Sequence, residues 1–129
     1  MDASALVKRY VAEPGSDVVR DAMAQADGWF MCRAGYVETV RAVGLAAGKK
    51  AARTVREEWP AIGVIEIDQR LVEHAAELTI DLDLRSLDAL HLAAALVLPR
   101  DDLVIATWDR KLHAAARTTG LRLIPETVP

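Results

Sequence analysis

The most constraining feature of the sequence is an apolar stretch from Ser86 to Leu98, which ends at Pro99. Apolar residues fall on every side of this stretch at helical spacing, so the predicted helix must be buried among other elements. Its one acidic residue is Asp88. With Ser86 as N-cap, Asp88 lies in the first turn, where free N–H groups and the helix dipole favour a negative charge. The alternative is a catalytic or metal-binding carboxylate, because a buried charge needs a compensating partner.

The rest of the chain alternates short apolar runs with helical patterns. Strands are predicted at 29–32, 62–67, 102–107 and 121–124. Helices are predicted to begin near residues 2, 16, 36, 49, 68, 86 and 110. Buried strands that alternate with helices predict a parallel sheet in a layered α/β sandwich, and the length of 129 residues suits a single domain over 1–129.

Composition and charge narrow the class of protein. No apolar run reaches the roughly 20 residues that a membrane-spanning helix requires, so we expect a cytoplasmic protein with no membrane partner. The net charge of −3 gives no general attraction for nucleic acid. A polyanionic partner would therefore be met by a local basic patch or by bound cations. The single cysteine, Cys32, excludes an internal disulfide and is predicted to be a small core residue.

The three histidines have separate predicted environments. His91 lies one turn after Asp88 and has two interpretations, a general base or a packed, hydrogen-bonded core histidine. Its place on an apolar helix favours the core interpretation. His74 and His113 are on amphipathic helices and are predicted to lie at the surface.

Four acidic residues occupy positions from which they can converge. Asp2, Glu38 and Asp109 each lie where a strand gives way to a helix, and Asp88 opens a helix. Each close pair of carboxylates repels by about 4 kcal/mol at 4 Å with an effective dielectric constant of 20. A hard divalent cation relieves this repulsion, because Mg²⁺ and Mn²⁺ take oxygen ligands and share them with substrate phosphates. The chemistry predicted is metal-dependent phosphodiester hydrolysis.

The segments that carry these acids resemble the successive motifs of PIN-domain ribonucleases, in the family's order. They are DASALVK at 2–8, ETVRA at 38–42, LDALHLAAAL at 87–96 and TWDRKL at 107–112. The pattern is most similar to VapC-type toxins of bacterial toxin–antitoxin pairs and covers essentially the whole chain. The resemblance implies a PIN-like three-layer α/β/α sandwich with a central, mainly parallel sheet. In the family a few apolar residues precede the first aspartate, so here either the first strand is truncated or the natural start lies upstream of Met1.

The resemblance also implies roles for individual residues. Four carboxylates would form the Mg²⁺ or Mn²⁺ site: Asp2 and Asp88 as central ligands, Glu38 as support for a metal or its waters, and Asp109 completing the cluster. Ser4 and Thr107 match small hydroxyl positions that are expected to hydrogen-bond to the carboxylates or to bound water. The alternative is that Ser4 caps the first helix and that Thr107 is a β-branched strand residue.

The function implied is that of an endoribonuclease toxin that inhibits translation by hydrolysing RNA. A cognate VapB-type antitoxin would neutralise it, the chain would form a homodimer, and DNA would be bound only indirectly, through the antitoxin. The main alternative is a catalytically inactive PIN-like module that binds a partner protein, although such a module has no reason to keep four mutually repelling acids. A phosphohydrolase or receiver-like domain with Asp2 as nucleophile or phosphoacceptor ranks third, because Asp2-Ala3-Ser4 offers no flanking acid.

Overall fold

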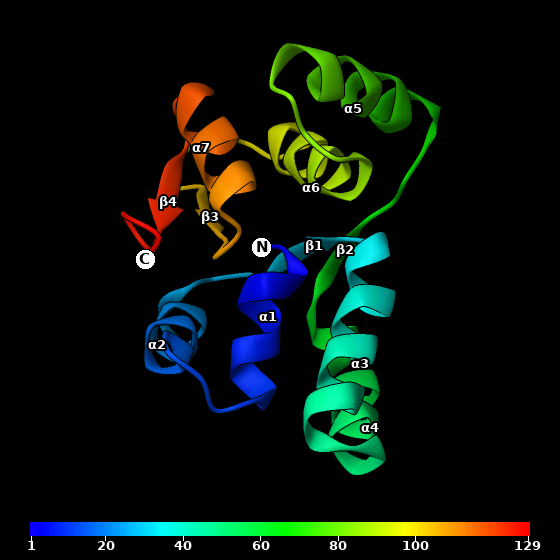
Figure 1. Ribbon diagram of the computed structural model, residues 1–129, viewed down its shortest axis with the longest axis vertical. Helices are drawn as coiled ribbons and strands as arrows, with labels where there is room; N and C mark the ends of the chain where they lie inside the picture. Colours follow the sequence, from blue (N-terminus) through cyan, green and yellow to red (C-terminus); the bar gives the residue numbers. More distant parts are fainter.

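The computed structural model describes residues 1–129 as seven α-helices, one short 3₁₀ helix and four short strands (Figure 1). In chain order the elements are α1 (Ala3–Tyr10), α2 (Ser16–Gln25), β1 (Phe30–Cys32), α3 (Ala34–Ala47), α4 (Lys49–Glu58), η1 (Trp59–Ala61), β2 (Gly63–Ile65), α5 (Gln69–Asp81), α6 (Ser86–Val97), β3 (Val104–Ala106), α7 (Arg110–Thr118) and β4 (Arg122–Ile124). All the predicted strands and helices are present. None of the helices is long and apolar enough to cross a membrane.

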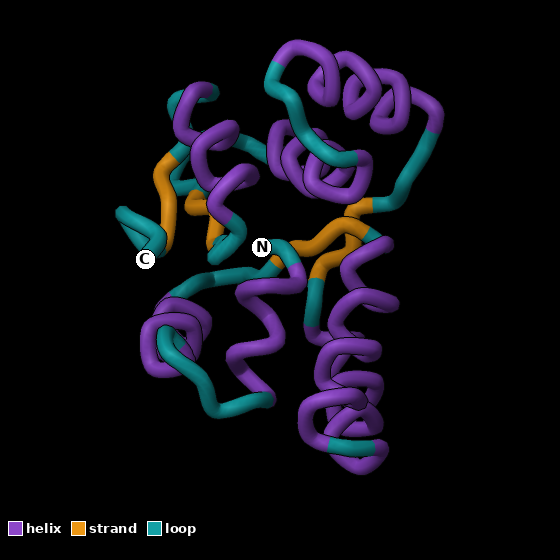
Figure 2. The backbone as a smooth tube through the Cα atoms, in the orientation of Figure 1, coloured by secondary structure: helices purple, strands orange, loops and turns teal.

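The strands form two parallel pairs, β1 with β2 and β3 with β4. The first two residues of the chain lie between the pairs (Figure 2). The Met1 amino group donates a hydrogen bond to the Phe30 carbonyl at 2.9 Å, and the Asp2 N–H donates to the Ala106 carbonyl at 3.3 Å. The predicted central parallel sheet is therefore present as two strand pairs that are linked through an extended Met1–Asp2 segment.

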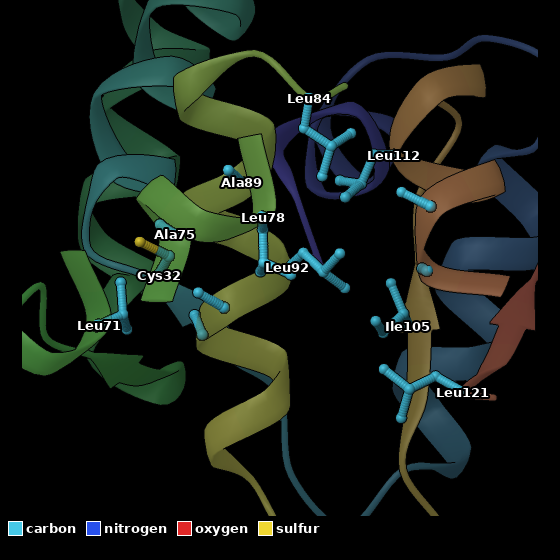
Figure 3. Packing of buried hydrophobic residues seen from close by; sticks show 14 residues of the cluster. Cys32, Leu71, Ala75, Leu78, Leu84, Ala89, Leu92, Ile105, Leu112 and Leu121 are labelled. Atoms are coloured by element: carbon cyan, nitrogen blue, oxygen red, sulfur yellow. The ribbon is translucent and has the colours of Figure 1, made fainter. Parts of the chain in front are cut away.

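Helix α6 is buried, as its apolar pattern predicts. It packs against α5, β1 and α7, and its side chains belong to the larger of two hydrophobic clusters. In Figure 3, Leu78 of α5 lies beside Leu92 of α6, and Ile105 of β3 lies across from them. The smaller cluster joins α1 and α2 to β1 through residues that include Leu6. These two clusters fix the N-terminal ends of α1, α6 and α7 relative to one another.

Aspartates cap three of the helices. Asp2, Asp68 and Asp109 each accept a hydrogen bond from the backbone N–H three residues later, at the start of α1, α5 and α7. The predicted cap at Ser86 is wrong, because α6 begins one residue earlier and its N-cap is Arg85, whose side chain makes no cap hydrogen bond. Asp88 nevertheless remains in the first turn of α6.

Candidate active site

Asp2 is a buried carboxylate held by three donors. Its Oδ1 accepts hydrogen bonds from the Ser4 hydroxyl at 2.7 Å and from the Ala5 N–H at 3.2 Å. Its Oδ2 accepts a bond from the Thr107 hydroxyl at 2.8 Å. Only 5% of the residue is exposed. The carboxylate of Asp2 is thus fixed in place although it belongs to the second residue of the chain.

Two hydroxyl groups connect the start of α1 to the loop between β3 and α7. Thr107 Oγ1 also accepts a hydrogen bond from the Asp109 N–H at 3.1 Å, and Ser4 Oγ accepts one from the Trp108 N–H at 2.8 Å. The two hydroxyl oxygens lie 3.4 Å apart. Ser4 is not the cap of α1, since Asp2 holds that position. Ser4 and Thr107 therefore bond to a carboxylate and orient the backbone that carries Asp109.

Arg85 bridges two further carboxylates. Its Nε donates to Asp88 Oδ2 and its Nη2 donates to Asp109 Oδ2, both at 3.3 Å. Burial raises the pKa of Asp88, and the negative charges of Asp109 and Asp2 raise it further, while Arg85 opposes the shift. Asp2, Asp88 and Asp109 therefore share one electrostatic environment in which the charged form of Asp88 is disfavoured.

Glu38 lies apart from these three aspartates in its contacts. It projects from α3, and its Oε1 lies 2.6 Å from Nε2 of His91 on α6. The Glu38 side chain is 27% exposed and the His91 side chain 4%. His91 is thus a buried, hydrogen-bonded histidine, as the apolar helix predicts, and its partner is one of the four predicted site acids.

The donor set fits a hard divalent cation that keeps most of its waters. No three acidic, histidine or cysteine side chains lie close enough to hold one ion by themselves. Mg²⁺ is commonly bound through only one or two carboxylates, together with waters and substrate phosphate. A cation would also offset the repulsion that raises the pKa of Asp88. The oxygen-only chemistry of the three aspartates therefore suits Mg²⁺ or Mn²⁺.

A groove with a volume of about 550 Å³ opens beside the acids. Its lining includes Ser4, which bonds to Asp2, and Glu38, together with Lys8, Arg41 and Trp108. Lys8 is paired with Glu13 at 2.8 Å and lies 5.0 Å from the centre of the Trp108 ring. Arg41 is exposed and makes no ion pair, so it is a cation available to an anionic ligand.

Sequence reasoning did not identify Arg85 or the contact between His91 and Glu38. Arg85 precedes Asp88 by three residues, a spacing that places both on one helix face and could have indicated the pair. No sequence pattern near Arg85 indicates that its guanidinium also donates to Asp109, which lies 24 positions away. The bond between His91 and Glu38 joins residues 53 positions apart.

Comparisons with known proteins show the family of this chain. A model of the PIN domain family matches residues 1–120. Ribonuclease VapC45 and ribonuclease VapC49 of Mycobacterium tuberculosis are each 34% identical to this chain over 133 residues, which covers 96% of this chain and 92% of each relative. Ribonuclease VapC46 of the same organism is 32% identical over 124 residues, covering 96% of this chain and 94% of the relative.

A solved structure shares the fold. The crystal structure of VapC20 of M. tuberculosis, a sarcin–ricin loop cleaving toxin, matches with a TM-score of 0.70 over 99% of this chain and 97% of that one. Because the two sequences are 16% identical, this likeness concerns the fold alone. The PIN-like α/β/α sandwich predicted from the motifs is confirmed, and with its match to the family model over residues 1–120 this chain belongs to the PIN domain family.

Proposed function

We propose that this chain is a VapC-type endoribonuclease toxin that hydrolyses RNA phosphodiester bonds with the help of Mg²⁺ or Mn²⁺. The observation that carries the proposal is the set of hydrogen bonds that joins the three aspartates: Arg85 donates to both Asp88 and Asp109, and Thr107 donates to Asp2 and accepts from the Asp109 N–H. Relatives named as ribonucleases, at up to 34% identity, support the choice of RNA as substrate.

The acids would hold the metal in distinct ways. Asp2 and Asp88 would be its central ligands, Asp109 would complete the set, and Glu38 would support the metal or its waters. A divalent cation supplies Lewis-acid polarisation of the phosphodiester and lowers the pKa of a bound water. The three donors to Asp2 keep its carboxylate in one orientation, so little rearrangement is needed when a cation binds.

Two arginines are placed to meet the phosphates of an RNA strand. The N–H groups of Arg85 donate hydrogen bonds to Asp88 and Asp109. A metal ion bound to these acids would replace the guanidinium, which could then donate to phosphate oxygens. Arg41 is available at the groove beside Glu38. Both guanidinium groups can donate two parallel hydrogen bonds to one phosphate.

A protein partner is also part of the proposal. Family membership supports neutralisation by a VapB-type antitoxin, a homodimeric toxin and contact with DNA only through the antitoxin. Val37 and Leu45 on α3 and Leu87 on α6 are large apolar residues that are between 45% and 73% exposed, and such residues favour contact with another protein. The site of action would be the cytoplasm, where translation takes place.

Cleavage of RNA by the purified chain tests the proposal. Total RNA is incubated with the protein in Mg²⁺, in Mn²⁺ or in chelator, beside the variant Asp88→Asn. We expect cutting that requires the metal, and a loss of about a hundredfold or more in the variant, because a metal contributes several kcal/mol to the transition state. Intact RNA under every metal condition, with no metal bound, would instead support the inactive protein-binding module.

A further inference from the structure

His91 is a buried polar side chain with one hydrogen-bond partner. Its Nε2 lies 2.6 Å from Glu38 Oε1, and the side chain is 4% exposed. Its other ring nitrogen, Nδ1, is buried and has no partner. A histidine on an otherwise apolar helix would be easily replaced by leucine or methionine if it served packing alone. Its single contact with a predicted site acid indicates a different role.

The unpartnered Nδ1 identifies which nitrogen carries the proton. A proton on Nδ1 would be a buried donor without an acceptor, which is strongly disfavoured, whereas a bare Nδ1 lone pair is less costly. The proton therefore lies on Nε2, which donates to the Glu38 carboxylate. Such a ring, buried and already committed to Glu38, cannot reach a water or a substrate hydroxyl as a general base.

The hydrogen bond restricts a side chain that would otherwise be mobile. Glu38 is on α3 and 27% exposed, and a glutamate has three rotatable bonds that water alone does not fix. His91 lies on α6, one turn beyond Asp88. One helix therefore carries both an acid of the aspartate group and the donor that fixes Glu38.

We propose that His91 is a positioning residue that holds the Glu38 carboxylate toward the metal site, with Glu38 Oε2 left free for the metal or its waters. This inference rests on the proposed metal-dependent ribonuclease activity. Groups that orient metal ligands typically change metal affinity or activity by ten- to a hundredfold when they are removed. His91 would act on the metal only through Glu38.

The test uses two variants of similar length that differ in their ability to donate. His91→Gln retains an N–H donor, and His91→Met fills the same apolar surroundings without one. We expect His91→Met to weaken Mn²⁺ binding, measured by calorimetry on metal-free protein, and to lower kcat, each by about ten- to a hundredfold. We expect KM for RNA to change less than about twofold, because His91 itself does not line the groove. We expect His91→Gln to recover most of both losses.

A double-mutant cycle with Glu38→Gln shows whether His91 acts through Glu38. In the Glu38→Gln protein, His91→Met should cause no further loss of Mn²⁺ affinity or kcat. If His91→Met lowers Mn²⁺ affinity and kcat in the Glu38→Gln protein by the same factors as in the wild type, the proposal is overturned. It is also overturned if the wild type binds Mn²⁺ and cuts RNA and His91→Met does both equally well. Absence of both activities in the wild type would contradict the proposed function itself, and with it this inference.

A measurement on the wild-type protein covers the case in which a variant fails to fold. Nitrogen-15 NMR of the metal-free chain reports which ring nitrogen of His91 is protonated. We expect a proton on Nε2. A ring whose only proton lies on Nδ1 would offer no donor to Glu38 and would overturn the proposal.

Discussion

Replacing Thr107 with valine tests the network that connects Asp2 to Asp109. Thr107 is fully buried, and valine keeps its branched shape while removing one hydroxyl. That hydroxyl donates to Asp2 Oδ2 at 2.8 Å and accepts from the Asp109 N–H at 3.1 Å. The substitution therefore removes a donor from a buried carboxylate and leaves a backbone N–H without its acceptor.

The size of the effect follows from these two bonds. A hydrogen bond to a charged group contributes about 1.5–3 kcal/mol, and an unsatisfied buried group costs about 1–3 kcal/mol. Because the two losses share one hydroxyl and do not simply add, we expect the free energy of unfolding to fall by about 3 kcal/mol. For a chain of this length that lowers Tm by roughly 10 °C. We also expect Mn²⁺ affinity and the rate of RNA cleavage to fall by about tenfold or more, because Asp2 loses a support.

Thr107→Ser is the matched control. It keeps the hydroxyl and loses one methyl group, which should cost about 1 kcal/mol of stability and leave Mn²⁺ binding close to that of the wild type. Thermal unfolding, Mn²⁺ calorimetry and RNA cleavage are measured on both variants. If Thr107→Val is as stable as Thr107→Ser and binds Mn²⁺ like the wild type, the hydroxyl does not organise the site and the reasoning is wrong.

Four further substitutions have expected outcomes. Burial in the folded protein raises the pKa of Asp88 above its value in the unfolded chain. The ionised carboxylate therefore destabilises the metal-free fold at a pH above the folded pKa, and the effect is absent well below the pKa of the unfolded chain. Asp88→Asn should therefore raise the free energy of unfolding of the metal-free protein at neutral pH. Urea unfolding measured across pH should show this gain being lost as the pH falls below 3.8, the ordinary pKa of an aspartate. Arg85→Gln removes the cation that bridges the acids, and calorimetry should show Mn²⁺ binding tightened by about threefold or more; weaker binding would contradict this role. Gly35→Ala would push a methyl carbon into the buried side chain of Met31, and overpacking of this kind costs about 1–3 kcal/mol. Gly44→Ala, whose methyl carbon would meet Ala52 Cβ at an ordinary contact distance of 3.6 Å, should instead stabilise α3 by about 0.5–1 kcal/mol in the same denaturation assay.

Three of the four acids predicted for the site have positions that depend on local structure. Asp2 and Asp109 follow from strand-to-helix junctions, where an aspartate caps the helix and reaches the edge of the sheet. The position of Asp88 could be predicted because it lies in the first turn of an apolar helix. Since the chain order of these junctions is visible in the sequence, the α/β architecture and its parallel strands could be predicted as well.

The features that were missed or predicted wrongly depend on contacts between distant segments. His113 was predicted at the surface but is 6% exposed, and its Nε2 lies 2.8 Å from the Pro125 carbonyl, because the C-terminal segment covers that face of α7. Arg85 bridges two acids that approach each other only when α6 and α7 pack together. The hydrogen bond between His91 and Glu38 likewise forms only when α3 packs against α6. Periodicity within one element carries no information about such pairings.

The most direct test of the metal-dependent ribonuclease site is to compare, in one preparation, the Mn²⁺ concentrations needed for binding and for RNA cleavage. Wild type, Asp88→Asn and Asp81→Asn are titrated; Asp81 is an exposed acid with no ion pair and serves as the control. The account predicts that the two midpoints coincide in the wild type and in Asp81→Asn, and that Asp88→Asn loses both binding and cleavage. An Asp88→Asn protein that binds Mn²⁺ and cuts RNA at wild-type concentrations would contradict it.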